Sequence, residues 1–299
     1  METPEAMPAS PRGPLIAEGK TKRIYEAPGE PTRAIVEYKN DITAFDNPEF
    51  TKQFNKKAEY SNIVNARVFE MLNAAGIPTA FVRQLSPTEF LSEKCTMVPL
   101  EVVARRYAVG SYLNRHPEFK QEGDVPHRFE EPVIEYFLKT TKGSLKSAAG
   151  ETLVEGLDPL KGEEDPFIPN PEDATWNLAL SKKPSTDPAA SLGRTIDSSK
   201  VLPSTDAIAE MTAMIRNTFL TLEAFFAEHD FKFVDFKIEF GVTTDGRLVI
   251  ADVIDNDSWR LRDKDWKDVS KQSFRNGEDM ATIEDKYERV AMLMEKSKK

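Results

Sequence analysis

The chain has 299 residues, which is enough for roughly two domains with a real hydrophobic core. Acidic residues outnumber basic ones by 50 to 40, and the formal net charge of −10 argues against nucleic acid as a partner. No apolar run approaches the ~18 residues of a membrane span, and the single cysteine, Cys95, excludes an internal disulfide, so we expect a cytoplasmic protein without membrane contact.

The first hundred residues predict a tail and a small lobe. Residues 1–14 are rich in proline and lack the apolar stretch of a secretion signal, which indicates a disordered tail. From about residue 54 to residue 75, apolar side chains recur at helical spacing until glycine and proline end the helix. Small antiparallel strands and this helix predict a compact N-terminal lobe over 15–103. We assign 104–299 to a C-terminal lobe.

A glycine–lysine loop, Gly19-Lys20-Thr21, lies near the start of the first lobe and matches the last three residues of the P-loop motif. The P-loop interpretation fails because Pro14 stands where that motif requires its first glycine. We expect a different phosphate-binding loop between two short strands, in which Gly19 lets the backbone approach a ligand while Lys20 and Lys22 supply positive charge. An ordinary surface turn is the alternative.

An arginine-rich segment, 105–115, begins the second lobe. Its arginines and the Gly110-Ser111 step suit bidentate binding of an anionic substrate, and a solvated basic helix face is the alternative. The segment 140–203 is rich in glycine, proline, serine and aspartate, so we expect a long irregular excursion with one short helix around Trp176–Leu180. Loops of this length either cover an active site or are disordered insertions.

Helical spacing of apolar residues predicts a long core helix before a hairpin, and an amphipathic helix at the C-terminal end. In the first strand of the hairpin, apolar and charged residues alternate, so Lys237 and Glu239 fall on one ionic face. Asp245-Gly246 favours a tight turn, and the second strand then returns Asp252 close to Glu239. Two carboxylates beside a lysine suit a magnesium–nucleotide site, whereas the solvated outer face of an edge hairpin is the alternative.

Several short motifs follow one another along the chain: Glu18-Gly19-Lys20-Thr21-Lys22, Pro99-Leu100-Glu101-Val102-Val103 with Arg105 and Gly110-Ser111, Asp235-Phe236-Lys237-Ile238-Glu239-Phe240-Gly241, and Asp257-Ser258-Trp259-Arg260 with Lys271 to Arg275. In this order they resemble the motifs of the phosphoribosylaminoimidazole-succinocarboxamide synthase family, also called the SAICAR synthetase family. The resemblance spans most of residues 15–139 and 204–290.

This resemblance implies an α+β, two-lobed fold related to the ATP-grasp enzymes. The small antiparallel N-terminal lobe, 15–103, would bind nucleotide, and the larger α+β C-terminal lobe, 104–299, would bind substrate and metal. The family reaction joins the carboxylate of carboxyaminoimidazole ribotide to the amine of L-aspartate and converts ATP to ADP and phosphate, with Mg²⁺ as cofactor. Because a carboxylate is a poor electrophile, it would be activated as an acyl phosphate. The expected partners are these small molecules, and the chain would be a monomer or a homodimer.

The resemblance also assigns roles to residues of this chain. The catalytic positions are Lys139, Lys237 and Asp165, and Lys237 also stands among the ribotide-binding groups. The nucleotide positions are Gly19, Lys20, Lys22 and the backbone from Met97 to Glu101. The ribotide positions are Arg105, Ser111, Asp257, Arg260, Lys271 and Arg275. The magnesium carboxylates are Glu239 and Asp252.

The chain departs from the family pattern at two places. Two Asp-Pro steps, at Asp158 and Asp165, compete for one family acid, and we favour Asp165 because Glu164 keeps the acidic context. Val253 follows the metal aspartate where many members have a second acid, which leaves the role of Asp255 open.

Two other functions fit parts of the pattern. A kinase would transfer phosphate to a hydroxyl, but the chain lacks the His-Arg-Asp signature of the kinase catalytic loop. A non-enzymatic nucleotide sensor would bind ATP without turning it over when all three substrates are supplied.

Overall fold

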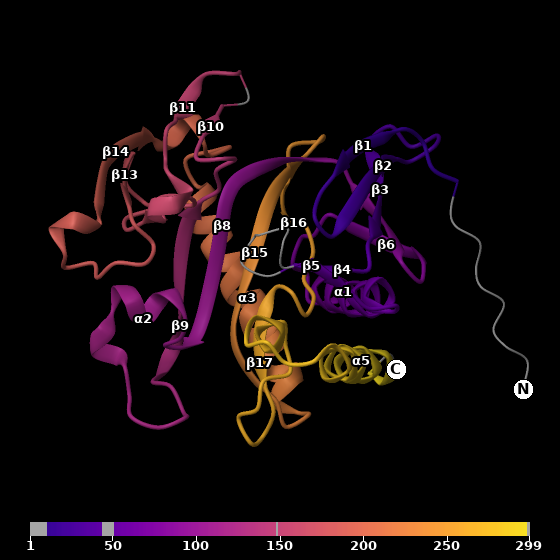
Figure 1. Ribbon diagram of the computed structural model, residues 1–299. Coiled ribbons are helices and arrows are strands. Elements are labelled where there is room, and N and C mark those ends of the chain that lie inside the picture. Colours follow the sequence, from indigo (N-terminus) through magenta and orange to yellow (C-terminus); the bar gives the residue numbers. More distant parts are fainter. Residues whose placement is uncertain (1–10, 44–50, 148, 298–299) are drawn as a thin grey trace, which may run out of the picture. The chain divides into compact units, whose positions relative to one another are not determined.

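The computed structural model describes residues 11–43, 51–147 and 149–297 of the chain (Figure 1). It divides into two compact units. The first unit combines Met1–Thr96 with Thr243–Lys299, and the second unit is Met97–Val242. The first unit is therefore assembled from both ends of the chain.

An antiparallel five-stranded sheet, with the strand order β1-β2-β3-β7-β6, forms the N-terminal part of the first unit. Its strands are β1 (Leu15–Glu18), β2 (Lys22–Glu26), β3 (Arg33–Tyr38), β6 (Phe81–Ser86) and β7 (Glu89–Glu93). A separate antiparallel pair follows, β4 (Asp41–Thr43) and β5 (Thr51–Gln53). The predicted small antiparallel sheet is thus present.

Two helices from opposite ends of the chain pack side by side in the first unit, α1 (Lys57–Ala74) and α5 (Met280–Lys296) (Figure 1). The α5 helix begins where the Asp279 carboxylate accepts the Thr282 N–H at 3.0 Å. Its buried side chains recur every three or four residues. The remaining elements of this unit are β16 (Leu248–Ala251), β17 (Trp259–Arg262) and α4 (Gln272–Arg275).

The second unit is built on strands that follow the order β14-β13-β12-β9-β8-β15. They are β8 (Cys95–Tyr107, from Met97 on), β9 (Arg128–Leu138), β12 (Phe167–Ile168), β13 (Thr175–Ala179), β14 (Ser191–Asp197) and β15 (Lys232–Thr243, up to Val242). The long helix α3 (Ala207–Ala227) packs on this sheet, where Phe219 contacts Phe233 and Phe236. The predicted core helix is therefore confirmed.

Short elements complete the second unit. They are α2 (Ser111–Arg115), β10 (Leu145–Lys146), β11 (Thr152–Val154), and the 3-10 helices η2 (Pro117–Phe119), η3 (Pro159–Lys161), η4 (Pro188–Ala190) and η5 (Ser198–Lys200).

The segment 140–203 differs from the irregular excursion that its composition predicts. It contains the strands β10 to β14, and the short helix expected around Trp176–Leu180 is the strand β13. Trp176 and Leu178 are 0% and 1% exposed, and Asn177 between them is exposed. This spacing of two is strand periodicity, which is hard to recognise in a segment of only five residues.

The predicted tail and lobe boundary also differ from the structure. Residues 1–10 of the tail lie outside the described residues, but Arg12 is ordered and donates to Glu37 at 2.8 Å and to Glu89 at 2.6 Å. The expected boundary at 103/104 falls within β8, and 243–299 joins the N-terminal residues because α5 packs on α1.

The ionic face of β15 is not the solvated face of an edge strand. Asp235 and Glu239 are only 3% and 6% exposed. After the strand, a turn forms in which the Thr243 N–H donates to the Arg247 carbonyl oxygen at 3.0 Å, and Gly246 adopts the positive φ that the sequence predicts.

Candidate active site

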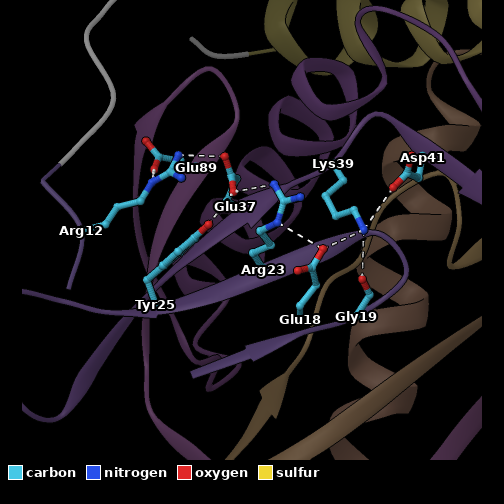
Figure 2. Close-up of polar contacts among 9 residues, drawn as sticks. All are labelled: Arg12, Glu18, Gly19, Arg23, Tyr25, Glu37, Lys39, Asp41 and Glu89. Atoms are coloured by element: carbon cyan, nitrogen blue, oxygen red, sulfur yellow. Dashed lines mark hydrogen bonds and ion pairs between the residues drawn. The ribbon is translucent and has the colours of Figure 1, made fainter. Parts of the chain in front are cut away.

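The glycine–lysine loop connects β1 to β2, as its sequence predicts. The Gly19 N–H donates to the Lys22 carbonyl oxygen at 2.9 Å, which closes the turn. Figure 2 shows the ionic contacts behind it: Lys39 Nζ donates to the Gly19 carbonyl oxygen at 3.3 Å and to a Glu18 carboxylate oxygen at 3.1 Å. Arg23 donates to the same Glu18 oxygen at 3.2 Å. These contacts therefore hold the Glu18 carboxylate and the Gly19 carbonyl group, and Lys20 is exposed.

Lys22 and Asp252 come together in the first unit. Lys22 Nζ donates to a carboxylate oxygen of Asp252. Asp252 adopts a φ of +64°, a conformation that non-glycine residues rarely adopt and that often marks functional positions. The structure thus pairs a residue predicted to bind phosphate with a residue predicted to bind magnesium.

A cluster of two lysines and two glutamates lies in the second unit, and we call it the Lys–Glu cluster. Lys237 Nζ donates to a Glu101 carboxylate oxygen at 2.5 Å, and Lys139 Nζ donates to Glu239. The cross pairs are longer, 3.9 Å from Lys237 to Glu239 and 4.0 Å from Lys139 to Glu101. Glu101 belongs to β8, Lys237 and Glu239 belong to β15, and Lys139 directly follows β9. Three neighbouring strands therefore bring the four charges together.

Opposite charges alternate in this cluster, so each glutamate lies near two ammonium groups. The side chain of Glu239 is 7% exposed, whereas Lys139 and Lys237 are each 42% exposed. The ammonium groups can therefore turn toward a bound anion while the glutamates stay in place. The sequence analysis placed Glu101 only at the backbone of a nucleotide-binding strand, and it missed the carboxylate of Glu101 as a partner of Lys237.

Asp165 lies beside this cluster through Thr140, the residue after Lys139. One carboxylate oxygen of Asp165 accepts the Thr140 N–H at 2.7 Å and the Thr140 hydroxyl at 3.2 Å. Burial raises the pKa of Asp165, and its φ is +50°. The competing Asp158 instead accepts the Leu160 N–H at 2.9 Å at the start of η3. Because the Asp158 carboxylate already serves as the N-cap of this 3-10 helix, we keep Asp165 as the candidate functional acid.

Arg105 is buried in an ion-pair network of the second unit. It donates to Glu135 at 2.6 Å, to Asp235, and to the Ser111 hydroxyl at 3.4 Å. The other Glu135 oxygen accepts from Arg115. The structure therefore brings Arg105 and Ser111 together as predicted, and the two carboxylates fix the plane of the Arg105 guanidinium group.

Asp257 lies at the centre of a buried cluster of the first unit. Its Oδ2 accepts from Lys271 Nζ at 3.0 Å and lies 3.3 Å from Lys57 Nζ, and its Oδ1 accepts the hydroxyl of Tyr287. Burial alone would raise the pKa of Asp257, but Lys271, Lys57 and the Tyr287 hydroxyl hold it well below its usual range. We call these residues, together with the fully buried Asp255, the Asp257 cluster.

Asp255 differs from Asp257 in its surroundings. Burial and the neighbouring Asp257 charge raise the pKa of Asp255. Its Oδ1 accepts the Asp257 N–H at 2.8 Å, so Asp255 shapes the turn that carries Asp257. The sequence motifs do not include Lys57 or Tyr287, which fall within the helix predicted over about 54–75 and within the predicted C-terminal helix.

The other predicted groups lie in separate elements. Arg260 is half-buried in β17, and Arg275 ends α4, where it donates to Gln272 at 3.4 Å. The positive charge of Arg275 also acts on Tyr287, so Arg275 borders the Asp257 cluster. Met97, the first residue of the second unit, is 42% exposed on β8.

No group of three or more histidine, cysteine, aspartate or glutamate side chains is placed to hold a metal ion within the described part of the chain. Glu239 in the second unit and Asp252 in the first unit each supply hard carboxylate oxygens, and each lies beside a lysine.

Comparisons with known proteins agree with this picture. The model of the SAICAR synthetase family matches residues 15–155 and 173–293. A phosphoribosylaminoimidazole-succinocarboxamide synthase of Chloroflexus aurantiacus is 35% identical over 291 residues, which is 95% of each chain. The same-named enzyme of Roseiflexus castenholzii is 35% identical over 266 residues, 88% of this chain and 87% of that one.

Solved structures share the fold. The synthase of Ehrlichia chaffeensis superposes with a TM-score of 0.70 at 24% identity and covers 94% of this chain and 98% of its own. A SAICAR synthetase solved in complex with ADP gives a TM-score of 0.71 at 24% identity, covering 96% and 99%. The expected α+β fold is thus confirmed. Among the helices that the structure describes, none is long and apolar enough to cross a membrane. The chain belongs to the SAICAR synthetase family.

Proposed function

We infer that this chain is an ATP-dependent amide-forming ligase of purine biosynthesis. It joins the carboxylate of carboxyaminoimidazole ribotide to the amine of L-aspartate and gives SAICAR, ADP and phosphate. The observation that carries this inference is the 35% identity to a named synthase over 95% of both chains. The Lys–Glu cluster supports it, because a ligase of this kind must balance phosphate charge during two successive transfers.

The chemistry proceeds in two steps. A carboxylate oxygen of the ribotide attacks the γ-phosphorus of ATP, the bond to the β-phosphate oxygen breaks, and ADP leaves. The neutral amine of aspartate then attacks the acyl carbon, the bond from this carbon to the phosphate oxygen breaks, and the nitrogen loses one proton as inorganic phosphate leaves. Both steps pass through states with concentrated negative charge, so fixed cations near the reacting phosphate lower both barriers.

The lysines provide these cations. Lys20 lies in the loop between β1 and β2, Lys22 begins β2, and we assign both to the nucleotide phosphates. We assign Lys139 and Lys237 to the transferred phosphoryl group, because each already lies against a carboxylate and can exchange that partner for phosphate oxygens. Asp165, held by Thr140, is positioned to orient the segment that begins with Lys139.

Glu239 and Asp252 would hold Mg²⁺ together with the phosphate oxygens of ATP. When bound, the cation would neutralise phosphate charge in the first step. We assign the adenine ring to the backbone from Met97 to Glu101, and the ADP complex of a solved SAICAR synthetase supports a nucleotide site in this family. Gly19 would give the phosphates access to the backbone of the loop.

We assign the ribotide to two groups of side chains. Arg105 and Ser111 belong to one network, which presents a guanidinium plane already fixed by its carboxylate partners. The second group consists of Asp257, Arg260, Lys271 and Arg275 in the first unit. Arginine is suited to the ribotide phosphate because its planar fork binds two oxygens at once.

Release of phosphate with each substrate omitted in turn tests the function. We expect release from ATP only when the ribotide and L-aspartate are both present. Phosphorylation of a hydroxyl compound in the absence of aspartate would favour a kinase. Binding of ATP without release in the complete mixture would favour a nucleotide sensor.

Other properties of the enzyme stay predictions. We propose a cytoplasmic location, since purine biosynthesis supplies soluble nucleotides there, and a monomer or a homodimer. A sedimentation experiment on the purified chain would decide between these two states.

A further inference from the structure

A fully buried lysine projects from the first turn of α1. The side chain of Lys57 is 0% exposed, although lysine is among the residues least often buried. Its Nζ lies 3.3 Å from Oδ2 of Asp257, in an ion pair without hydrogen-bond geometry. Lys57 Nζ also lies over the face of the Tyr287 ring, 5.8 Å from its centre, which is a cation–π arrangement. A buried charge must be compensated, and Asp257 supplies the compensation.

A fully buried tyrosine reaches the same carboxylate from α5. The hydroxyl of Tyr287 donates to Oδ1 of Asp257, while its ring packs edge-on against Phe54 with centres 5.3 Å apart. One oxygen of Asp257 therefore faces Lys271 and Lys57, and the other faces Tyr287. Contacts on both oxygens fix the rotation of the carboxylate as well as its position.

We propose that Lys57 and Tyr287 are positioning residues for the ribotide: they hold the carboxylate of Asp257, and through it the ammonium group of Lys271, in the orientation that the substrate meets. This inference rests on the proposed function, in which Asp257 and Lys271 bind the ribotide. Neither Lys57 nor Tyr287 belongs to a motif of that function. Both come from helices that pack on each other, so the paired helices determine where the binding loop presents its charges.

The ammonium group of Lys57 acts on both carboxylates of the cluster. It pairs with Asp257, which Lys271 also contacts, and its charge acts on the buried Asp255. Without Lys57, Lys271 would be the remaining ammonium group paired with Asp257 in this cluster, and the carboxylate would attract it more strongly. A substrate anion would then compete less well for Lys271.

The Tyr287→Phe variant tests the proposal with the smallest change, because it keeps the ring that packs against Phe54. We expect the KM for the ribotide to rise by about tenfold, with the KM for ATP and kcat within about twofold of the wild type. Tyr60→Phe is the matched control. Tyr60 is a buried tyrosine on α1 whose hydroxyl faces Glu288 and not Asp257, so its ribotide KM should not change.

A double-mutant cycle separates positioning from general stability. If Tyr287 acts through Asp257, Tyr287→Phe should change the ribotide KM by no more than about twofold in an Asp257→Asn background. A purely structural role predicts lower thermal stability and an equal change of ribotide KM in both backgrounds, or none in either. Either of these results would overturn the proposal.

Lys57→Met should raise the ribotide KM more than Lys57→Arg, because arginine keeps the positive charge. Lys94→Met, which breaks the 3.1 Å ion pair to Glu26 in the same unit, is the control for loss of a lysine. If Lys57→Met does not fold, the tyrosine cycle decides alone. A wild-type chain without ribotide-dependent ADP formation would instead overturn the proposed function, so the two failures are distinguishable.

Discussion

Single residues of the candidate site are already paired with opposite charges. Lys139 contacts Glu239, and Lys22 contacts Asp252, so two of the lysines assigned to phosphate each pair with a carboxylate assigned to magnesium. Of these four groups Glu239 is the buried one, with its side chain 7% exposed, and Lys139 offsets its charge before nucleotide binds. Exchange of these partners for ATP and Mg²⁺ would then keep the local charge balanced.

Glu239→Gln keeps the shape of the side chain and removes its charge. We expect turnover to fall by about two orders of magnitude or more at saturating Mg²⁺, because the substitution removes a hard anionic ligand from a site for a dication. Thermal unfolding should show that the fold is retained. Glu131→Gln is the control, since Glu131 is an exposed residue of the same unit that pairs with Arg216 at 3.3 Å. Near-normal turnover of Glu239→Gln would refute the assignment.

Arg260→Lys tests the clamp on the ribotide phosphate. We expect the ribotide KM to rise at least about tenfold, which corresponds to ~1.4 kcal/mol, with little change for ATP, because an ammonium group cannot bind two oxygens in parallel. Arg262→Lys on the same strand is the control, because Arg262 is engaged with Asp268 at 2.6 Å. An equal loss for ATP and ribotide, or none, would show that Arg260 is not the clamp.

Gly19→Ala separates ligand approach from folding. A Cβ at this position would meet only the Lys22 carbonyl oxygen, at 3.9 Å, so the melting temperature should be unchanged. The KM for ATP should still rise by about tenfold, because the added methyl group would lie where phosphate approaches the backbone. Gly143→Ala is the opposite case: its Cβ would lie 1.9 Å from the Leu157 carbonyl oxygen, and stability should fall. An unchanged ATP KM in Gly19→Ala would contradict the role of the loop.

At the scale of elements, periodicity decided what the sequence could predict. The core helix α3 and the terminal helix α5 repeat their apolar residues over many turns, so both were found. The strands β10 to β14 have seven residues or fewer, and proline and glycine around them indicate loops equally well. Their pairing is decided by partners distant in the sequence, such as Phe167 of β12 against Phe137 of β9.

Limited proteolysis tests the role of the segment 140–203. We expect cleavage near Leu160, which is 97% exposed on η3, and protection of β13, whose Trp176 is buried. An ATP analogue together with the ribotide should slow this cleavage, because Lys139 and Asp165 flank the susceptible part. Identical cleavage patterns with and without ligands would show that the segment does not respond to the site.

At the scale of the molecule, the two ends of the chain build one unit. The sequence predicted Asp257 and Lys271 as binding residues from their motifs, but nothing in those motifs shows that Lys57, far away in the sequence, lies against them. Packing of α1 on α5 creates this neighbourhood, and a single sequence carries no signal for such a contact. The motifs therefore predict the residues that bind the ribotide, and the packing of the helices shows which residues hold them in position.

Activation of the ribotide carboxylate as an acyl phosphate is tested most directly by following the oxygen atoms of that carboxylate during the reaction. Ribotide labelled with ¹⁸O in its carboxylate is converted with ATP and L-aspartate, and the released phosphate is analysed by mass spectrometry. Activation as an acyl phosphate predicts one labelled oxygen in the phosphate for each SAICAR formed, because the carboxylate oxygen that attacks ATP leaves with the phosphoryl group. Unlabelled phosphate formed together with SAICAR would contradict it.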